Sequence, residues 1–277
     1  MAHTGIPAQP APSRKARGLG DRLLDRFFTT ARILEIEQIA ARTVRLRLGG
    51  PDLHDLTWIP GQQVRIATGA AETGNPLARM GELRTYSVWH HDPEAGELHL
   101  CVLDHGDGPG ARWARAARVG QEVRFRGPEG SFTLYSPTPA APQAPPPHHP
   151  LREDAPYHLF AGEETAAVAF GPMLRAIPDD VPVHGAVETA TAADRLPLPR
   201  AAELSHPLRG TASAARSETL LNAIRDLALP PTPGIAYLAG EARTIQLITK
   251  HLVTDRLWPR RAIRTKPFWT PGKRGMD

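Results

Sequence analysis

Six short stretches in the first half of the chain carry hydrophobic and polar residues in alternation. The clearest is Thr-Val-Arg-Leu-Arg-Leu at residues 43–48. A period of two is typical of an antiparallel strand with one buried and one solvated face. Strands are predicted at residues 32–39, 42–48, 63–68, 84–90, 97–104 and 122–126, and residues 92–96 suit a hairpin turn. Six such strands with one helix predict a closed or nearly closed antiparallel β-barrel.

The pattern changes after residue 153, where strand-like runs alternate with runs of helical spacing. Strands are predicted at residues 157–161, 181–188 and 235–239, and helices at residues 164–177, 217–229 and 242–257. This alternation predicts a parallel α/β sheet. Proline-rich residues 136–152 predict a stiff linker, and residues 1–30 a flexible extension. The fold class is therefore a two-domain α+β protein, with a β-barrel at 31–135 and an α/β domain at 153–277.

Composition removes several classes of protein from consideration. The 277 residues suffice for two domains, and no window approaches the roughly 18 apolar residues of a membrane span. The single cysteine, Cys101, excludes an intramolecular disulfide and a metal site made only of cysteines. No apolar segment follows the basic N-terminal residues, so we expect no secretory signal and a cytoplasmic location. We also expect a monomer. The net charge of +4 comes without a nucleic-acid-binding motif, so we expect no nucleic-acid partner.

Arg84-Thr85-Tyr86-Ser87 puts a permanent cation, a phenol and a hydroxyl on one predicted strand. Alternation places Arg84 and Tyr86 on one face and Thr85 and Ser87 on the other, unless a bulge lets Tyr86 and Ser87 reach the same ligand. These groups suit a flavin, with a guanidinium for the pyrophosphate, a ring to stack and a hydroxyl for a ring nitrogen. An ordinary strand with an exposed arginine and a half-buried tyrosine is the alternative.

A glycine-rich loop leads into a predicted helix about twenty residues later, at residues 105–113. Pro109 suits the first turn of a helix, where its missing N–H has no intrahelical partner. Gly108 and Gly110 flank it, and Ala111 begins a run of good helix formers. Unpaired amides and the positive end of the helix dipole make such a junction an anion site. A plain strand-to-helix turn is the alternative.

In this order and spacing, the two segments resemble the FAD domain of the siderophore-interacting protein family. That family consists of ferric-siderophore reductases within the ferredoxin–NADP reductase superfamily. The resemblance extends over about residues 32–275. Its further segments are Pro60-Gly61-Gln62, Gly127-Pro128-Glu129-Gly130-Ser131, Ala161-Gly162-Glu163-Glu164-Thr165-Ala166, Ala239-Gly240-Glu241-Ala242 and the terminal Phe268-Trp269 with Gly272. Most are weak motifs individually, and their collinear order carries the resemblance.

The resemblance implies FAD on the barrel, NADPH or NADH on the α/β domain and an iron(III)-siderophore between them. Electrons would pass from the dinucleotide through FAD to iron(III), which requires no catalytic residue and no protein-bound metal. Iron(II) would then be released, because it binds hard-oxygen siderophores far more weakly. The cofactor-binding residues implied in this way are Arg84, Thr85, Tyr86, Ser87, His105, Gly108, Pro109, Gly110, Ala111, Trp113, Gly162, Glu163, Thr165, Gly240, Glu241 and Trp269.

Cations close to the C-terminus are candidates for the substrate side. Lys266, Arg264 and Lys273 flank the aromatic pair at residues 268–269. A cleft for an anionic siderophore or a dinucleotide would be lined with permanent cations. A solvated basic tail that only aids solubility is the alternative.

Several features depart from the family's pattern. Trp89 stands where members commonly have a second arginine, and Glu163 stands where aspartate is more usual. Residues 204–209 differ from the usual strand with an aromatic residue and an arginine. No G-x-G-x-x-G fingerprint accompanies Gly162 or Gly240. A flavin reductase for another acceptor, and a siderophore-binding protein without activity, therefore stay open as alternatives.

Overall fold

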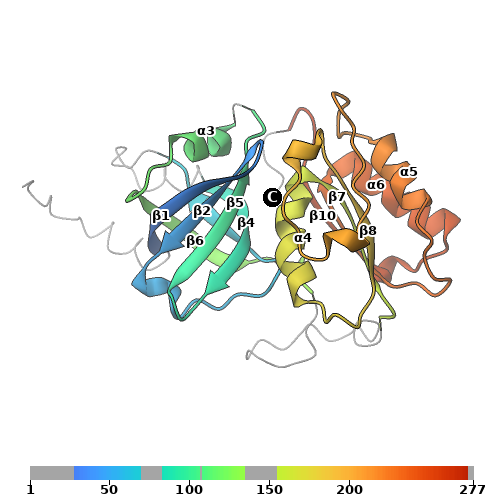
Figure 1. Cartoon of the computed structure of the whole chain (residues 1–277), viewed down its shortest axis with the longest axis horizontal. Helices are drawn as coiled ribbons and strands as arrows, with labels where there is room; N and C mark the ends of the chain where they lie inside the picture. Colours follow the sequence, from blue (N-terminus) through green and yellow to red (C-terminus); the bar gives the residue numbers. More distant parts are fainter. Residues whose placement is uncertain (1–27, 70–82, 107, 135–154, 274–277) are drawn as a thin grey trace, which may run out of the picture.

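The computed structural model describes residues 28–69, 83–106, 108–134 and 155–273. An N-terminal β-barrel and a C-terminal α/β domain lie side by side (Figure 1). The predicted linker at 136–152 lies outside the described residues, and so does the predicted extension up to residue 27.

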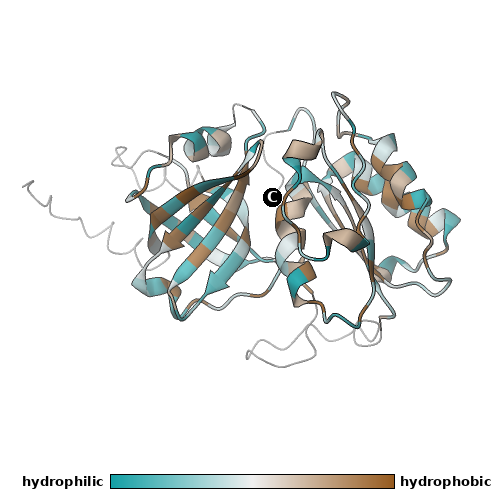
Figure 2. Ribbon diagram, viewed as in Figure 1, coloured by the Kyte–Doolittle hydropathy of each residue, from teal (hydrophilic) through white to brown (hydrophobic). Residues whose placement is uncertain are grey.

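Six antiparallel strands close the barrel in the order β1-β2-β5-β4-β3-β6, which confirms the predicted architecture. Leu46 and Leu48 are fully buried inside it, whereas Arg45 and Arg47 face outward and form ion pairs with glutamates of neighbouring strands. Figure 2 shows this alternation along the barrel strands. The strands are β1 (Thr29–Ala40), β2 (Thr43–Gly49), β3 (Gln63–Ala67), β4 (Leu83–Asp92), β5 (Glu97–Leu103) and β6 (Glu122–Glu129).

Helix α3 (Pro109–Ala116) lies across one end of the barrel (Figure 1). Gly108 is its N-cap and Pro109 its first residue, so Pro109 lies in the first turn, as predicted. Trp113 and Ala114 pack on the hydrophobic core of the barrel. The fold thus places the start of α3 at the end of the barrel.

Four parallel strands form the sheet of the second domain, in the order β10-β9-β7-β8. They are β7 (His158–Glu163), β8 (Val183–Glu188), β9 (Ile235–Glu241) and β10 (Ile263–Trp269). The parallel sheet was predicted, but β10 was not. Its sequence mixes cations, aromatic residues and Pro267, a composition that an edge strand tolerates and a central strand does not.

The helices of this domain lie on both faces of the sheet. Helix α4 (Glu164–Ala176) covers the face toward the barrel, and α5 (Glu218–Arg225) and α6 (Ala242–Lys250) cover the other (Figure 1). Helix α5 ends earlier than predicted, and the predicted helix at 242–257 changes after Lys250 into a π-helical turn, His251–Asp255. None of the helices in the described ranges is long and apolar enough to cross a membrane.

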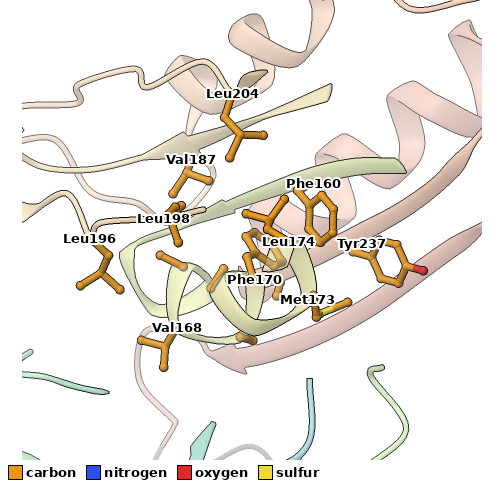
Figure 3. Close-up of a cluster of buried hydrophobic side chains, with 14 of the residues drawn as sticks. Phe160, Val168, Phe170, Met173, Leu174, Val187, Leu196, Leu198, Leu204 and Tyr237 are labelled. Atoms are coloured by element: carbon orange, nitrogen blue, oxygen red, sulfur yellow. The ribbon is translucent and has the colours of Figure 1, made fainter. Parts of the chain in front are cut away.

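The hydrophobic core between α4 and the sheet extends to the barrel. Phe170 and Leu174 of α4 pack with Phe160 and Tyr237 of the sheet (Figure 3). Trp89 of β4 joins the same cluster, and a Cβ placed on Gly171 of α4 would lie only 2.2 Å from its ring. The contact between the two domains is therefore packed like a domain interior.

Polar contacts at the tip of the β1–β2 hairpin add to this interface. The Arg42 guanidinium lies 2.8 Å from carboxylate oxygens of both Glu164 and Asp194. The amide of Ala41 donates to the carbonyl oxygen of Ala193 at 2.8 Å. Apolar contacts along α4 and charged contacts at its start together hold the barrel against the second domain.

Candidate cofactor and substrate site

Arg84 and Tyr86 face inward at the end of the barrel that α3 covers. In the ladder between β3 and β4 they stand opposite Ile66 and Val64, which are fully buried in the barrel core. Directly opposite residues of a ladder share one face of the sheet. A Cβ placed on Gly110 would lie 2.6 Å from Tyr86 Oη and 3.8 Å from Arg84 Cγ. The fold thus brings the arginine, the tyrosine and the start of α3 together.

Several hydrogen-bond donors beside Tyr86 and the start of α3 are not used by the described residues. Tyr86 Oη is buried and has none among the described residues, and burial raises the pKa of the phenol well above its ordinary value. The first α-helical bond of α3 runs from Arg112 N to Gly108 O, so the amides of Gly110 and Ala111 precede any intrahelical acceptor. One of the five donors of Arg84 goes to the carbonyl of Leu83.

Those groups fit FAD. Two amides at a helix start and a guanidinium suit a pyrophosphate. The close approach of Gly110 leaves no room for a side chain, and the rings of Tyr86 and Trp113 are 5.6 Å apart. The orphaned phenol would gain a partner from a polar cofactor. Both the donor set and the orphaned atom therefore agree with a bound flavin dinucleotide.

Thr85 and Ser87 lie on the opposite face of β4. The ladder between β3 and β4 is regular from Leu83 to Ser87, and the bulge of β4 comes later, between Val88 and His90. A bulge therefore does not bring Ser87 to the side of Tyr86. Trp89 also points away from Arg84, into the contact with α4.

The carboxyl ends of β7 and β9 bring the second group of predicted residues together. Each strand ends in a glutamate that caps the following helix. Glu163 accepts hydrogen bonds from the amide and hydroxyl of Thr165, at 2.8 and 2.5 Å. Glu241 accepts from the amides of Arg243 and Thr244, both at 2.9 Å. A Cβ placed on Gly240 would lie 2.6 Å from Glu163 Oε1, so only a glycine allows this approach.

Both glutamates also accept hydrogen bonds from side chains at the end of β10 and just after it. Trp269 Nε1 donates to Glu163 Oε1 at 2.9 Å, and Thr270 Oγ1 donates to Glu241 Oε1 at the same distance. Burial raises the pKa of Glu163 to about 7. Burial also opposes ionisation of Glu241, but the hydrogen bonds outweigh it and lower the pKa of that group. Carboxylates of the chain itself thus occupy the anion positions at the starts of α4 and α6.

A buried ion network beside this edge was not predicted. Arg209 makes two 2.7 Å bonds to Glu164, which also accepts from Ala190 N at 2.8 Å. Glu188, fully buried at the end of β8, accepts from the hydroxyl of Ser217 and lies 3.5 Å from Arg209. Residues 204–209 bring Arg209 here because they run beside β8 in parallel bridges. The sequence feature that could have indicated this network is Glu164, a second acidic residue directly after Glu163 at the end of a predicted strand.

The predicted substrate cations lie on and after β10. Ile263 packs against the cluster of α5 and α6, and Phe268 against the cluster that faces the barrel. Alternation therefore places Arg264 and Lys266 on the barrel-facing side with Phe268. Lys266 is partly exposed and has no ion-pair partner among the described residues. Lys273 is exposed just beyond the strand.

Two family models match different parts of this chain. Residues 32–132 match the Siderophore-interacting FAD-binding domain, and residues 155–272 match the Siderophore-interacting protein family. The chain belongs to the siderophore-interacting protein family, with the fold of the ferredoxin–NADP reductase superfamily.

Particular relatives lie within that family and fold. Ferric vibriobactin reductase ViuB of Vibrio cholerae is 26% identical over 69% of this chain and 65% of its own length. A siderophore utilization protein from T. fusca has a structure with a TM-score of 0.73, at 25% identity over 90% of this chain and 95% of that one. The ferredoxin reductase in carbazole 1,9a-dioxygenase, 18% identical with a TM-score of 0.62 over 87% of this chain and 69% of that one, shares the fold. The chain spans less than two thirds of the length of the curated relatives it matches.

Proposed function

We propose that this chain is an FAD-dependent reductase that passes electrons from NADPH or NADH to the iron(III) of a ferric siderophore. One dinucleotide supplies two electrons and releases a proton, and two iron(III) ions each accept one electron and become iron(II). The observation that carries the proposal is the convergence of Arg84, the buried phenol of Tyr86 and the open amides of α3 at one corner. In this proposal the chain works as a cytoplasmic monomer.

The chain's own contribution is to bind and orient. Arg84 and the amides of Gly110 and Ala111 would hold the pyrophosphate, with the dipole of α3 adding attraction. Tyr86 would give its hydroxyl a polar partner on the cofactor. FAD, when bound, supplies the means to split a two-electron donor into single-electron steps. A protein in this role needs no acid–base pair of its own.

Binding of the ferric siderophore, the electron acceptor, would depend on positively charged side chains. Ferric siderophores of the catecholate type are strongly anionic, and Arg264 and Lys266 share the sheet face that looks toward the barrel. Lys273 follows beyond the end of the strand. These cations would attract such a complex to the proposed flavin site at Arg84, Tyr86 and the start of α3. ViuB, a ferric vibriobactin reductase by its name, supports this class of substrate.

Flavin content of purified protein, read from visible absorption, tests the proposal. Arg84→Ala should weaken FAD binding about tenfold to a hundredfold, since a charge-assisted contact contributes about 1.5–3 kcal/mol. Arg45→Ala, which removes an outward-facing arginine of β2, should leave FAD content unchanged. Wild-type protein that ignores added FAD would refute the proposal and favour a siderophore-binding role.

Tyr86→Phe separates a cofactor role from a packing role. The hydroxyl is buried without a partner, so its removal should leave the apo protein equally stable or more stable. The same change should weaken FAD binding if the cofactor supplies that partner. Unchanged FAD affinity together with raised apo stability would place the hydroxyl outside the cofactor site.

A further inference from the structure

The turn that follows α6 exposes a leucine in an unusual backbone conformation. Leu257 is 81% exposed, the most of any large hydrophobic side chain in the described ranges. Its φ of 57° lies in the left-handed region, which glycine and asparagine adopt more readily than other residues. A leucine here raises the free energy of the backbone and leaves an apolar side chain in water. Folding therefore gives no reason for a leucine at this position.

Contacts on both sides of Leu257 hold this turn in place. The Arg256 guanidinium donates to the carbonyl oxygens of Arg225 and Leu227, at 2.9 and 3.0 Å. Trp258 is buried, and its amide donates at 2.9 Å to a carbonyl oxygen of the π-helical turn that precedes it. The neighbours of Leu257 are thus fixed in the domain, and the leucine side chain itself projects into solvent.

Exposed cations lie on either side of this leucine along the chain. Residues 250–261 contain four basic residues and one acidic residue. Lys250, Arg260 and Arg261 are exposed and have no ion-pair partner among the described residues. The one acidic residue, Asp255, lies 2.9 Å from a ring nitrogen of the histidine that begins the π-helical turn. The surface around the leucine is therefore positively charged.

We propose that the turn containing Leu257, together with Lys250, Arg260 and Arg261, docks this chain on the surface of an anionic lipid membrane. Cations attract the phosphates of anionic lipids, and an exposed apolar side chain enters the boundary between headgroups and acyl chains. An acidic protein partner fits less well, because protein interfaces have an apolar core that is poor in charged residues. Three cations and one leucine predict a reversible association at about millimolar lipid.

The docking surface lies at the amino ends of the parallel strands. The turn Arg260–Ala262 directly precedes β10, whose first residue pairs with Ala236 near the start of β9. Glu163 and Glu241 stand at the carboxyl ends, at the other end of the sheet. A membrane-bound molecule would therefore keep its carboxyl edge accessible to ligands. The inference goes beyond the proposed reductase function and does not depend on a bound flavin.

Sedimentation of the full chain with lipid vesicles tests the role of charge. Wild type should bind vesicles of equal parts phosphatidylglycerol and phosphatidylcholine, should bind less as salt rises, and should not bind phosphatidylcholine alone. Arg260→Gln combined with Arg261→Gln should lower partition into the anionic vesicles about thirtyfold, since each cation near such a surface contributes about fivefold. Arg243→Gln, exposed at the other end of α6, is the matched control and should leave partition unchanged.

Leu257→Asn separates contact with lipid from a structural role. Asparagine adopts the left-handed conformation more readily, so the free energy of unfolding in urea should be unchanged or higher. Partition into the anionic vesicles should nevertheless fall about tenfold, because burial of a leucine side chain contributes at least that factor. Val119→Asn removes another exposed apolar side chain, in the loop before β6, and should leave partition unchanged.

Equal partition of wild type and the variants at residues 257, 260 and 261 would overturn the proposal, as would the absence of binding to anionic vesicles. Binding to soluble polyglutamate that requires Arg260 and Arg261 but not Leu257, without binding to vesicles, would also overturn it and indicate an acidic protein partner. Flavin content, measured on the same variants, should match wild type, so failure of the reductase proposal is read separately.

Discussion

Gly171 offers the sharpest test of how the two domains are joined. It lies inside α4, and a Cβ at this position would meet two atoms of the Trp89 ring at 2.2 and 2.5 Å. Carbon atoms in proteins do not approach so closely. The ring has little room to retreat, because the Arg175 guanidinium lies 5.7 Å from its centroid and Arg175 also donates to the Trp89 carbonyl. Gly171→Ala should therefore force the barrel and α4 apart.

Three effects contribute to the free energy of this change. Alanine favours a helix by about 1 kcal/mol over glycine. A side chain before Pro172 opposes that gain, since proline restricts the residue before it. The clash with Trp89 should cost about 1–3 kcal/mol, the usual range for overpacking. Only the third effect depends on Trp89, so a second substitution isolates it.

The assay is a double-mutant cycle with Trp89→Leu, using urea unfolding followed by circular dichroism. Helix propensity and the proline effect are present in both backgrounds and cancel in the cycle. Gly171→Ala should be more destabilising by about 1–3 kcal/mol when Trp89 is present than when leucine replaces it. Additivity within about 0.5 kcal/mol would refute the packed interface.

Three further changes test other parts of the molecule. Gly110→Val should reduce FAD content, because a Cβ there already lies 2.6 Å from Tyr86 Oη, and normal flavin content would make the loop a simple turn. Lys266→Ala should raise KM for a ferric catecholate several-fold at low salt and weaken its salt dependence, whereas Lys250→Ala on α6 should not. The pKa of Glu163 is raised to about 7, so the folded state holds a proton that the unfolded state releases above about pH 4.5. Stability should therefore fall as pH rises between these values, and Glu163→Gln should flatten the slope in urea unfolding at several pH values, while an unchanged slope would contradict the assignment.

The strands and helices that could be predicted from the sequence are those with a clear local pattern of hydrophobic and polar residues. Alternating residues such as those of β2 define a strand, because one side chain in two must be buried. Helix α4 was found from the spacing of Ala167, Phe170 and Leu174, all of which are buried in the structure. The closed barrel and the parallel sheet follow from the number and order of such elements. Helix ends were less predictable, as α6 shows, because a π-helical turn has the same composition as a helix.

Features that depend on contacts far apart in sequence had no local signal. β10 is a strand because β9 offers it a free edge, and its own sequence shows no clean alternation. The position of Trp89 suggested a lost phosphate contact, but its partner is Gly171, more than eighty residues away. Glu163 and Glu241 were selected as cofactor residues, and their hydrogen bonds to residues 269–270 appeared only when β10 was placed beside β9.

Glu164 connects the domain contact with the carboxyl edge of the sheet. It is almost fully buried, and both Arg42 from the barrel and Arg209 from the edge beside β8 bind it. Burying a carboxylate is costly unless its partners are well placed, so this network holds its members in one arrangement. Glu164 directly follows Glu163, which caps α4 and accepts a hydrogen bond from the indole of Trp269. Two consecutive residues therefore connect the tip of the β1–β2 hairpin with the end of β10.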